Sequence, residues 1–318
     1  MLEKNILVLI PVNEKHKKLL EEKAPSANFT YVDDKIVDTD QVQNANIIIG
    51  NPPIDMIKGS KKLEWLQLSS AGVGEYAKDN VLPHSAVLTN ATGAYGLAIS
   101  EYMLGVLLEL YKKLHLYRDN QLESNWSYQG QVKSIYNSTA LIVGAGDIGG
   151  EFAKRIKALG AYTIGIRRKD TNKPDYLDEL HVMENLDVLL PRADIVALSL
   201  PGTKLTKGII NRKTLKWMKH DAVLINVGRG NAIDTEALCD TLESGHLLGA
   251  ALDVTDPEPL PREHRLWKIK NVIITPHISG GYSLQETHER IIRISANNLE
   301  AFLNGKSISN VVDLSAGY

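Results

Sequence analysis

The sequence predicts an α/β protein made of two domains, each containing a parallel β-sheet. The 318 residues correspond to about two domains of ordinary size. Short apolar, β-branched stretches alternate with amphipathic helical stretches along most of the chain. One long helical stretch, over 97–122, interrupts this alternation, which then starts again. The interruption indicates that a second domain of the same class follows the first.

The composition is that of a globular protein without an unusual partner. Hydrophobic residues make up 43% of the chain and charged residues 23%. Lys and Arg total 36 and Asp and Glu total 38, so the formal charge of −2 argues against nucleic-acid binding. The apolar run 6–12 is too short for a signal peptide or a membrane span. Cys239 is the single cysteine, so no internal disulfide forms. We therefore expect a cytoplasmic protein with no membrane partner.

Five strands are predicted in the first domain, separated by Gly, Pro and Asn residues. A charged helix is expected over about 13–23, between the first two strands. The predicted strands span residues 5–11, 29–33, 45–50, 63–70 and 86–90.

Six strands are predicted in the second domain, with helices between them. Asp234 is expected to cap one helix and Gly245 to end it. A last helix, over 283–303, should return to the first domain, because 308–314 resembles a strand without a local partner. The predicted domains are 1–99 plus 289–318, and 100–288. The six strands span residues 139–146, 162–167, 194–201, 222–228, 247–254 and 271–276.

A dinucleotide-binding motif occupies the first turn of the second domain. Gly144, Gly146 and Gly149 form G-x-G-x-x-G directly after an apolar strand and at the start of an amphipathic helix. This context is the one the motif requires, since glycine-rich turns alone are common. The first glycine permits a tight turn, the second lets a pyrophosphate approach the backbone, and the third lets helix and strand pack closely. The helix N-terminus then attracts the phosphates.

The end of the next strand indicates which nucleotide is bound. An NAD site usually places an acidic residue about 20 residues after the motif, on the ribose 2′-hydroxyl. Here Arg167 and Arg168 occupy that place, and no acid precedes Asp170. Two guanidinium groups would bind a 2′-phosphate, although a solvated basic turn has the same appearance. We expect NADP(H) to be preferred, with NAD(H) also possible.

Three further residues follow strand ends of the second domain: Arg229, Glu258 and His277. Ligands of parallel sheets bind at the carboxyl ends of the strands. Each residue alone has an ordinary structural explanation, as a helix-dipole partner, a solvated loop residue or a buried histidine. Beside a nucleotide motif, the three together favour reduction of a 2-oxo acid. A His would protonate the carbonyl oxygen, a carboxylate would orient the His, and an Arg would clamp the substrate carboxylate. The other histidines lack metal-ligand spacing, so no metal is expected.

Five segments, in order, resemble the signatures of the D-isomer-specific 2-hydroxyacid dehydrogenase family. They cover residues 90–105, 140–160, 225–234, 250–261 and 274–281. The resemblance implies a Rossmann nucleotide domain inserted in a flavodoxin-like substrate domain. It also implies that Arg229 binds the substrate carboxylate, that His277 is the acid/base and that Glu258 is its partner. Nucleotide domains of this family pair through the region of the long helix, so a homodimer is expected.

The resemblance also assigns the remaining contacts. The loop from Ser69 to Gly74 corresponds to the family's substrate loop, whose backbone N–H groups meet the carboxylate. Substrate contacts are therefore expected at Ala71, Gly72, Val73 and Tyr95. Cofactor contacts beyond the glycines and arginines are expected at Asp147, Ile148, Pro201, Thr206, Val227, Asp253 and Gly280.

The sequence thus predicts NADPH-dependent, reversible reduction of a 2-oxo acid (glyoxylate, hydroxypyruvate or a larger one) to the D-2-hydroxy acid. One alternative is a D-3-phosphoglycerate dehydrogenase without a regulatory domain. Such enzymes usually carry Arg in the substrate loop, where this chain has Ser69 and Ser70, and 318 residues leave no room for the extra domain. The other alternative is a non-catalytic, NAD(P)-sensing corepressor, a class that shares the fold and a similar triad but has long additional tails.

Overall fold

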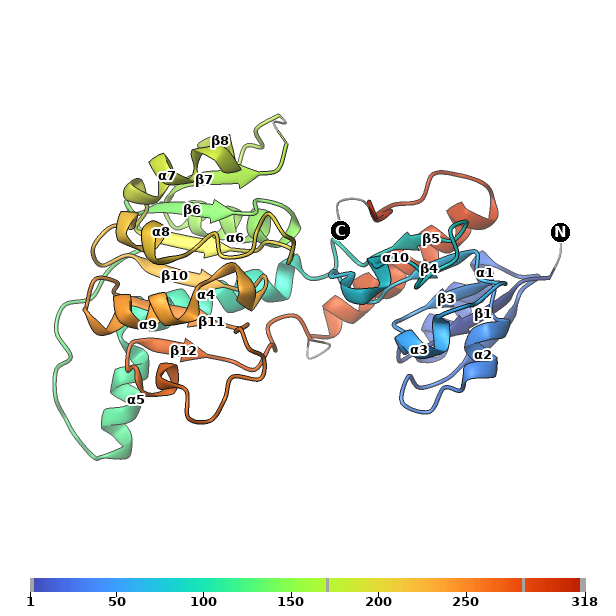
Figure 1. Cartoon of the computed structure of the whole chain (residues 1–318), viewed down its shortest axis with the longest axis horizontal. Helices are drawn as coiled ribbons and strands as arrows, with labels where there is room; N and C mark the ends of the chain where they lie inside the picture. The colour runs from blue at the N-terminus through green and yellow to red at the C-terminus, as the bar shows by residue number, and fades with distance from the viewer. Residues whose placement is uncertain (1–2, 170–171, 282–283, 315–318) are drawn as a thin grey trace. The chain divides into compact units, whose positions relative to one another are not determined.

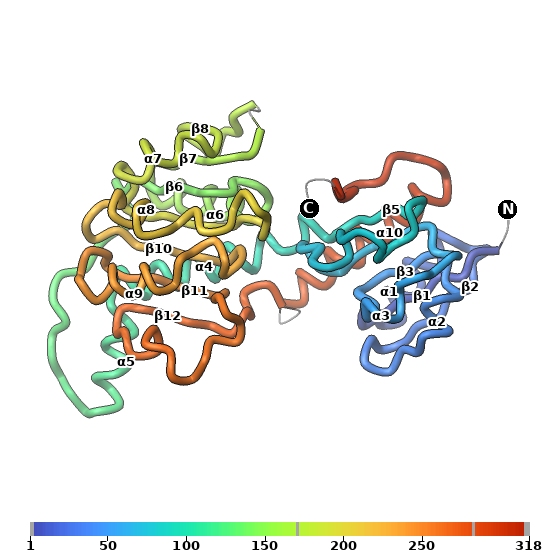
Figure 2. The backbone as a smooth tube through the Cα atoms, in the orientation of Figure 1, coloured from blue at the N-terminus to red at the C-terminus, as the bar shows by residue number. Residues whose placement is uncertain are grey.

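The computed structural model describes residues 3–169, 172–281 and 284–314, which divide into two compact units (Figure 1). Unit 1 comprises Met1–Tyr95 and Tyr282–Tyr318, and unit 2 comprises Gly96–Gly281. Both boundaries lie a few residues before those predicted, and at the first of them the first helix of unit 2 already begins at Gly96. Figure 2 shows the backbone passing from unit 1 into unit 2 and returning for the final helix.

Unit 1 contains a five-stranded parallel sheet in the order β2-β1-β3-β4-β5. This is the flavodoxin-like order, and it confirms the predicted class. Leu7, Ile48 and Leu66 of the strands belong to one buried core cluster with Val42 and Ile57. The strands are β1 (Asn5–Val8), β2 (Asn28–Tyr31), β3 (Ile47–Ile49), β4 (Trp65–Gln67) and β5 (Val87–Thr89). The helices are α1 (Glu14–Lys23), α2 (Thr39–Asn44), α3 (Ile54–Ile57) and α10 (Gln285–Leu303).

Helix α10 returns to unit 1 as predicted and packs against α1. A buried hydrogen bond and an aromatic contact fix it to the sheet: Asn298 Nδ2 donates to Gln67 Oε1 (2.8 Å), and Phe302 stacks on Trp65. The tail after α10 pairs with β5 only through an antiparallel bridge, Thr89 to Val311, and is shorter than the strand predicted there. Ser283, where the helix was expected to begin, lies outside the described residues.

Unit 2 contains a seven-stranded parallel sheet in the order β12-β11-β10-β9-β6-β7-β8. The order reverses at β6, as in a Rossmann fold with one further strand. The strands are β6 (Thr139–Val143), β7 (Tyr162–Arg167), β8 (Glu179–Val182), β9 (Ile195–Leu198), β10 (Val223–Asn226), β11 (Gly249–Leu252) and β12 (Val272–Ile274). The helices are α4 (Gly96–Lys112), α5 (Leu114–Leu122), α6 (Asp147–Ala158), α7 (Leu186–Leu189), α8 (Arg212–Trp217) and α9 (Thr235–Glu243).

Two features of unit 2 differ from the prediction. The long helix is broken in two, because Lys113 adopts a left-handed conformation (φ 59°) between α4 and α5. The side chain of Lys113 reaches the segment that follows α5 and donates to Gln129 O (2.6 Å). Strand β8 was not predicted, since all four of its residues are only partly buried. Asp234 caps α9 as predicted, accepting from Ala237 N (3.0 Å).

Candidate active site

The three chemically suggestive residues follow three adjacent strands of unit 2. Strand β11 pairs with β10 on one side and with β12 on the other. Arg229 follows β10, Glu258 follows β11 and His277 follows β12, all at the carboxyl end of the sheet. The loops after β10 and β11 touch, because a Cβ atom on Gly230 would lie 1.9 Å from Thr255 O. The strand order therefore gathers the residues that the sequence singled out.

His277 and Glu258 form a direct pair. His277 Nδ1 lies 2.7 Å from Glu258 Oε1, and both side chains are roughly half exposed. With the Nδ1 proton directed at the carboxylate, Nε2 is the ring nitrogen that can deliver a proton to a substrate. Within the described ranges, no protein group lies within hydrogen-bond distance of Nε2. The pair thus has the geometry of an oriented acid/base.

Asp253 holds the turn that carries His277. Its carboxylate is almost fully buried (1% exposed) and accepts from Thr275 Oγ1 (2.6 Å) and the Ile278 N–H (2.9 Å). The second oxygen accepts from the N–H and the hydroxyl of Ser279. The His277 N–H in turn donates to Asp253 O (2.8 Å), which helps to stabilise the left-handed backbone of His277 (φ 53°). The sequence predicted a cofactor contact for Asp253, and the contacts that the structure shows are those with the turn that carries the histidine.

Tyr102, on α4, is linked to Asp253 through the hydroxyl of Thr275. Tyr102 Oη lies 2.7 Å from Thr275 Oγ1. Since the Thr275 hydroxyl donates to Asp253, the Tyr102 hydroxyl must be the donor to Thr275. Burial raises the pKa of Tyr102 to about 12, so its hydroxyl stays protonated and remains a donor at neutral pH.

Arg229 is held by its own turn. Asn226 Nδ2 donates to Arg229 O (3.0 Å), and the Gly228 N–H donates back to Asn226 Oδ1 (3.0 Å). One guanidinium nitrogen, Nη1, donates to Gly228 O (2.7 Å). The side chain is partly buried, and its remaining N–H groups are sufficient for a carboxylate.

The glycine-rich turn fits a dinucleotide. A Cβ atom on Gly144 would lie 2.7 Å from Ser199 O, and one on Gly149 would lie 2.4 Å from Gly144 O. A Cβ atom on Gly146 would meet nothing within 4 Å, so the backbone there borders open space. Gly146 caps α6 without any side-chain hydrogen bond, which leaves the first turn suited to phosphate oxygens.

The two arginines after β7 have different surroundings. Arg167 Nε donates to Ala145 O (2.7 Å) inside the glycine-rich turn, and Nη2 donates to Tyr176 Oη (3.1 Å). Arg167 therefore supports the turn itself. Arg168 is exposed and directly follows the strand. Asp170, which would follow them, lies outside the described residues.

The other predicted cofactor residues also lie at the carboxyl end of this sheet. Pro201 and Thr206 belong to the loop after β9, where Thr206 Oγ1 donates to Pro201 O (2.6 Å). Val227 is buried directly after β10. Asp147 and Ile148 begin α6, and Gly280 lies in the turn after His277.

The first four carbonyl groups of the predicted substrate loop in unit 1 all accept hydrogen bonds. Tyr95 Oη donates to Ser69 O (2.6 Å) and the Ala91 N–H donates to Ser70 O (2.9 Å). The carbonyl of Ala71 accepts from Asn90 Nδ2 (3.0 Å), and that of Gly72 accepts from Ser70 Oγ (2.6 Å). These contacts fix the loop over 69–72.

The N–H groups of the same loop are available. Among the described residues, no acceptor is within hydrogen-bond distance of the N–H groups of residues 70–73. Four successive donors, on a backbone held by its carbonyls, suit an anion such as a carboxylate.

Asn51 and Asn90 were not predicted. Asn51 Oδ1 accepts from the Ser69 N–H and Oγ (both 2.9 Å), and Asn51 Nδ2 donates to Ser70 Oγ (3.1 Å). Both asparagines follow strand ends, β3 and β5, so the strand-end rule that identified Arg229 could have found them.

Two negative findings concern the described part of the chain. It contains no group of three or more His, Cys, Asp or Glu residues arranged to hold a metal ion. None of its helices combines the length and apolarity needed to span a bilayer.

Comparison with known proteins places the chain in a family. Residues 104–279 match the family model described as "D-isomer specific 2-hydroxyacid dehydrogenase, NAD binding domain". A glyoxylate reductase from Thermofilum pendens is 32% identical over 260 residues, covering 79% of this chain and 75% of that enzyme. A D-3-phosphoglycerate dehydrogenase from Methanocaldococcus jannaschii is 28% identical over 318 residues, covering 97% of this chain but only 59% of the longer enzyme.

The fold agrees as well. A crystal structure of a D-isomer-specific 2-hydroxyacid dehydrogenase family protein from Aeromonas salmonicida superposes with a TM-score of 0.85 at 30% identity. That superposition covers 98% of this chain and 99% of the other.

Proposed function

Because this chain belongs to the D-isomer-specific 2-hydroxyacid dehydrogenase family, we propose that it reduces a 2-oxo acid to the D-2-hydroxy acid, reversibly and with NADPH preferred over NADH. The observation that carries the proposal is the hydrogen bond between His277 Nδ1 and Glu258 Oε1 beside a glycine-rich turn that fits a dinucleotide. The phosphates would lie on Gly144, Gly146 and Gly149.

A bound reduced nicotinamide would supply a hydride to the carbonyl carbon of the substrate. His277, protonated on both nitrogens, gives its Nε2 proton to the carbonyl oxygen, so that hydride and proton together yield the alcohol. Glu258 keeps the ring oriented through Nδ1 and stabilises its positive charge before transfer. Arg229 holds the substrate carboxylate by charge and by paired N–H groups.

A second feature suited to a carboxylate lies within unit 1, in the four N–H donors of residues 70–73. A carboxylate adjacent to the reacting carbonyl is common to all 2-oxo acids, so these contacts do not select among them. The loop has Ser69 and Ser70 where phosphoglycerate enzymes usually carry Arg, which favours an unphosphorylated substrate. The match to a phosphoglycerate dehydrogenase nevertheless makes 3-phosphohydroxypyruvate a necessary competitor in any assay.

The decisive experiment measures nicotinamide oxidation with glyoxylate, hydroxypyruvate and 3-phosphohydroxypyruvate, each with NADPH and with NADH, and determines the chirality of the product. Arg229→Lys keeps the charge but loses the paired donors, so substrate KM should rise and kcat fall while cofactor Kd is unchanged. Arg262→Lys, an exposed site in the same unit, is the matched control. Tight cofactor binding without turnover of any 2-oxo acid would favour the nucleotide-sensor alternative.

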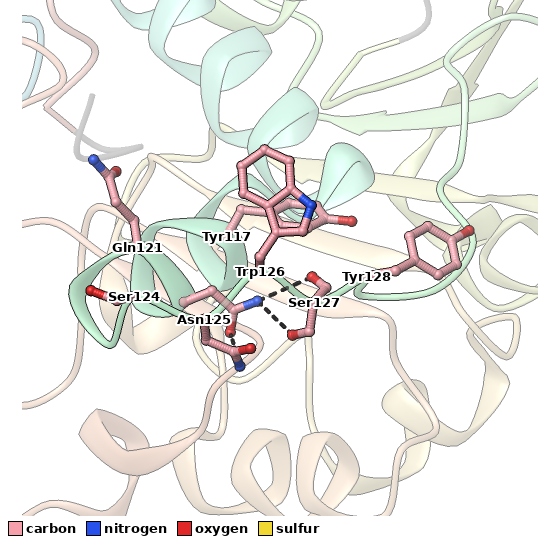
Figure 3. Close-up of a pocket in the computed structure, with 8 residues that line it drawn as sticks. Tyr117, Gln121, Ser124, Asn125, Trp126, Ser127 and Tyr128 are labelled. Atoms are coloured by element: carbon pink, nitrogen blue, oxygen red, sulfur yellow. Dashed lines mark hydrogen bonds between the residues drawn. The ribbon is translucent and has the colours of Figure 1, made fainter.

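We further propose that the protein is a homodimer assembled through the segment after α5. Trp126 and Tyr128 are strongly exposed there (103% and 77%), and a hollow of about 700 Å³ lies between them and α5 (Figure 3). Large exposed apolar patches on a globular protein usually mark an interface. Sedimentation velocity should show a dimer, and Trp126→Ser should shift it towards monomer.

A further inference from the structure

A cavity of about 540 Å³ lies in unit 1, at the carboxyl ends of β1, β2 and β3. Its lining includes the apolar residues Leu9, Val12 and Val32 and the ring of Tyr31. In the sheet order, β1 and β3 are neighbours with β2 beyond β1, so the cavity sits at the point where the strand order reverses. Ligands of open parallel sheets bind at such points.

The cavity adjoins the proposed carboxylate loop. Asn51 and Ser69 line it, and Asn51 binds Ser69 and Ser70 by three hydrogen bonds. Gly50 brings Asn51 close to β1, since a Cβ atom at this position (φ 126°) would lie 2.8 Å from Leu9 Cβ. The loop follows β4, which is two strands from β1, so the cavity extends about 10 Å from the loop.

The charges at the cavity are balanced. Lys17 pairs with Glu14 (2.7 Å), and Tyr31 Oη donates to Glu21 Oε1 (3.0 Å). Lys35, Asp33 and Asp34 make up the rest of the charged lining, so the positive charge of Lys17 is already compensated and the lining has no surplus cation. A binding site for a second carboxylate would need an uncompensated cation in the cavity, whereas a neutral, largely apolar group meets no such requirement.

Building on the proposed function, we infer that this cavity receives the side chain of the substrate. The substrate class is then a 2-oxo acid with a neutral side chain of roughly four or more carbons, long enough to extend from the loop into the cavity. Its carboxylate lies on the N–H groups of residues 70–73. Glyoxylate, which has no side chain, would leave the cavity empty.

The test compares kcat/KM for 4-methyl-2-oxopentanoate, phenylpyruvate, 2-oxoglutarate and glyoxylate. We expect the two neutral acids to exceed glyoxylate about tenfold or more, because several buried methylene groups are worth at least that factor. Val12→Trp fills the half-buried wall and should lower the ratio of phenylpyruvate to glyoxylate about tenfold. Ile36→Trp, at a 75% exposed position of the same unit outside the cavity, should leave the ratio unchanged.

Val32→Phe provides a second filling variant in case Val12→Trp does not fold. The inference is overturned if glyoxylate is the best substrate, if 2-oxoglutarate exceeds both neutral acids, or if the filling variants lower all substrates equally. These results differ from failure of the proposed function, in which the unmodified protein reduces none of the four acids with either cofactor.

Discussion

The two sheets present their functional groups at the same edge but in different chemical form. Unit 2 uses charged side chains after β10, β11 and β12, and the pair His277 and Glu258 is its clearest element. Unit 1 uses backbone N–H groups after β4, and its side chains serve to occupy the carbonyls of the same loop. Under the proposed function, the side chains of unit 2 act directly, whereas those of unit 1 act through the main chain.

This difference implies that substitutions at the carboxyl ends of the strands have different effects in the two units. Loss of an acting side chain removes a chemical step. Loss of a side chain that orders a loop weakens binding, while the N–H donors themselves persist. Substitutions in the two units should therefore separate kcat from KM.

The largest effect is expected for His277→Ala. It removes the proton donor and should lower kcat for 2-oxo acid reduction about 10²-fold to 10⁴-fold. Cofactor Kd, measured by fluorescence titration, should stay near that of the unmodified protein, because the phosphate site is on the turn at 144–149. His84→Ala, at an exposed position of unit 1, is the control. Full activity of His277→Ala would show that the side chains of unit 2 do not carry the reaction.

A second substitution, Asn51→Ala, tests the role of side chains in unit 1. It removes three hydrogen bonds from the loop over 69–70. Substrate KM should rise about tenfold, since a hydrogen bond contributes about 1 kcal/mol. We expect kcat to change much less. Asn28→Ala, at an exposed site of β2, should change neither value. A fall in kcat as large as that of His277→Ala would abolish the distinction between the two units.

Cofactor choice should depend on Arg168 more than on Arg167. Arg168→Ala should raise the KM for NADPH about tenfold and leave that for NADH unchanged, because one charge-assisted contact is lost. Arg167→Ala should weaken both cofactors alike, because Arg167 Nε supports the turn through Ala145 O. Steady-state kinetics with both cofactors checks this, and equal changes in the two KM values for Arg168→Ala would argue against a 2′-phosphate contact.

The smallest effect concerns a residue at neither functional edge. Glu179 on β8 binds Arg192, His181 and Tyr162, and these hydrogen bonds, led by that of Arg192, lower its pKa from 4.5 to about 2. The depressed pKa stabilises the fold above pH 4.5, and this contribution is lost as the pH falls towards 2. Glu179→Gln should lower Tm by about 2–4 °C at neutral pH. Calorimetry should show that the difference in Tm between Glu179→Gln and the unmodified protein vanishes near pH 2. The substitution should leave the enzyme activity unchanged.

Much of the fold was predictable from the sequence. Buried strands such as Ile47–Ile49 are continuous apolar runs, and helices such as α9 begin at a capping residue, here Asp234. Strand β8 was not, since its partial burial leaves no such run. At the break, the side chain of Lys113 donates to Gln129 O beyond the next helix, and local periodicity does not contain such a contact.

Some residues of the candidate site were likewise predictable from the sequence, and others were not. Arg229, Glu258 and His277 were identifiable because charged residues after apolar strands stand out. The roles of Asn51 and Asn90 depend on which carbonyl group each amide reaches, and residue type does not specify this.

The donors of the loop over 70–73 are peptide groups, which neither ionise nor gain charge across the range in which proteins are folded. Binding on this loop should therefore be almost indifferent to pH. Short-range dipoles of this kind are also less affected by ionic strength than a lysine or arginine pair. Under the proposed function, acidification and added salt would thus act on the reaction through the charged groups of unit 2, while the affinity of the loop in unit 1 for a carboxylate would stay constant.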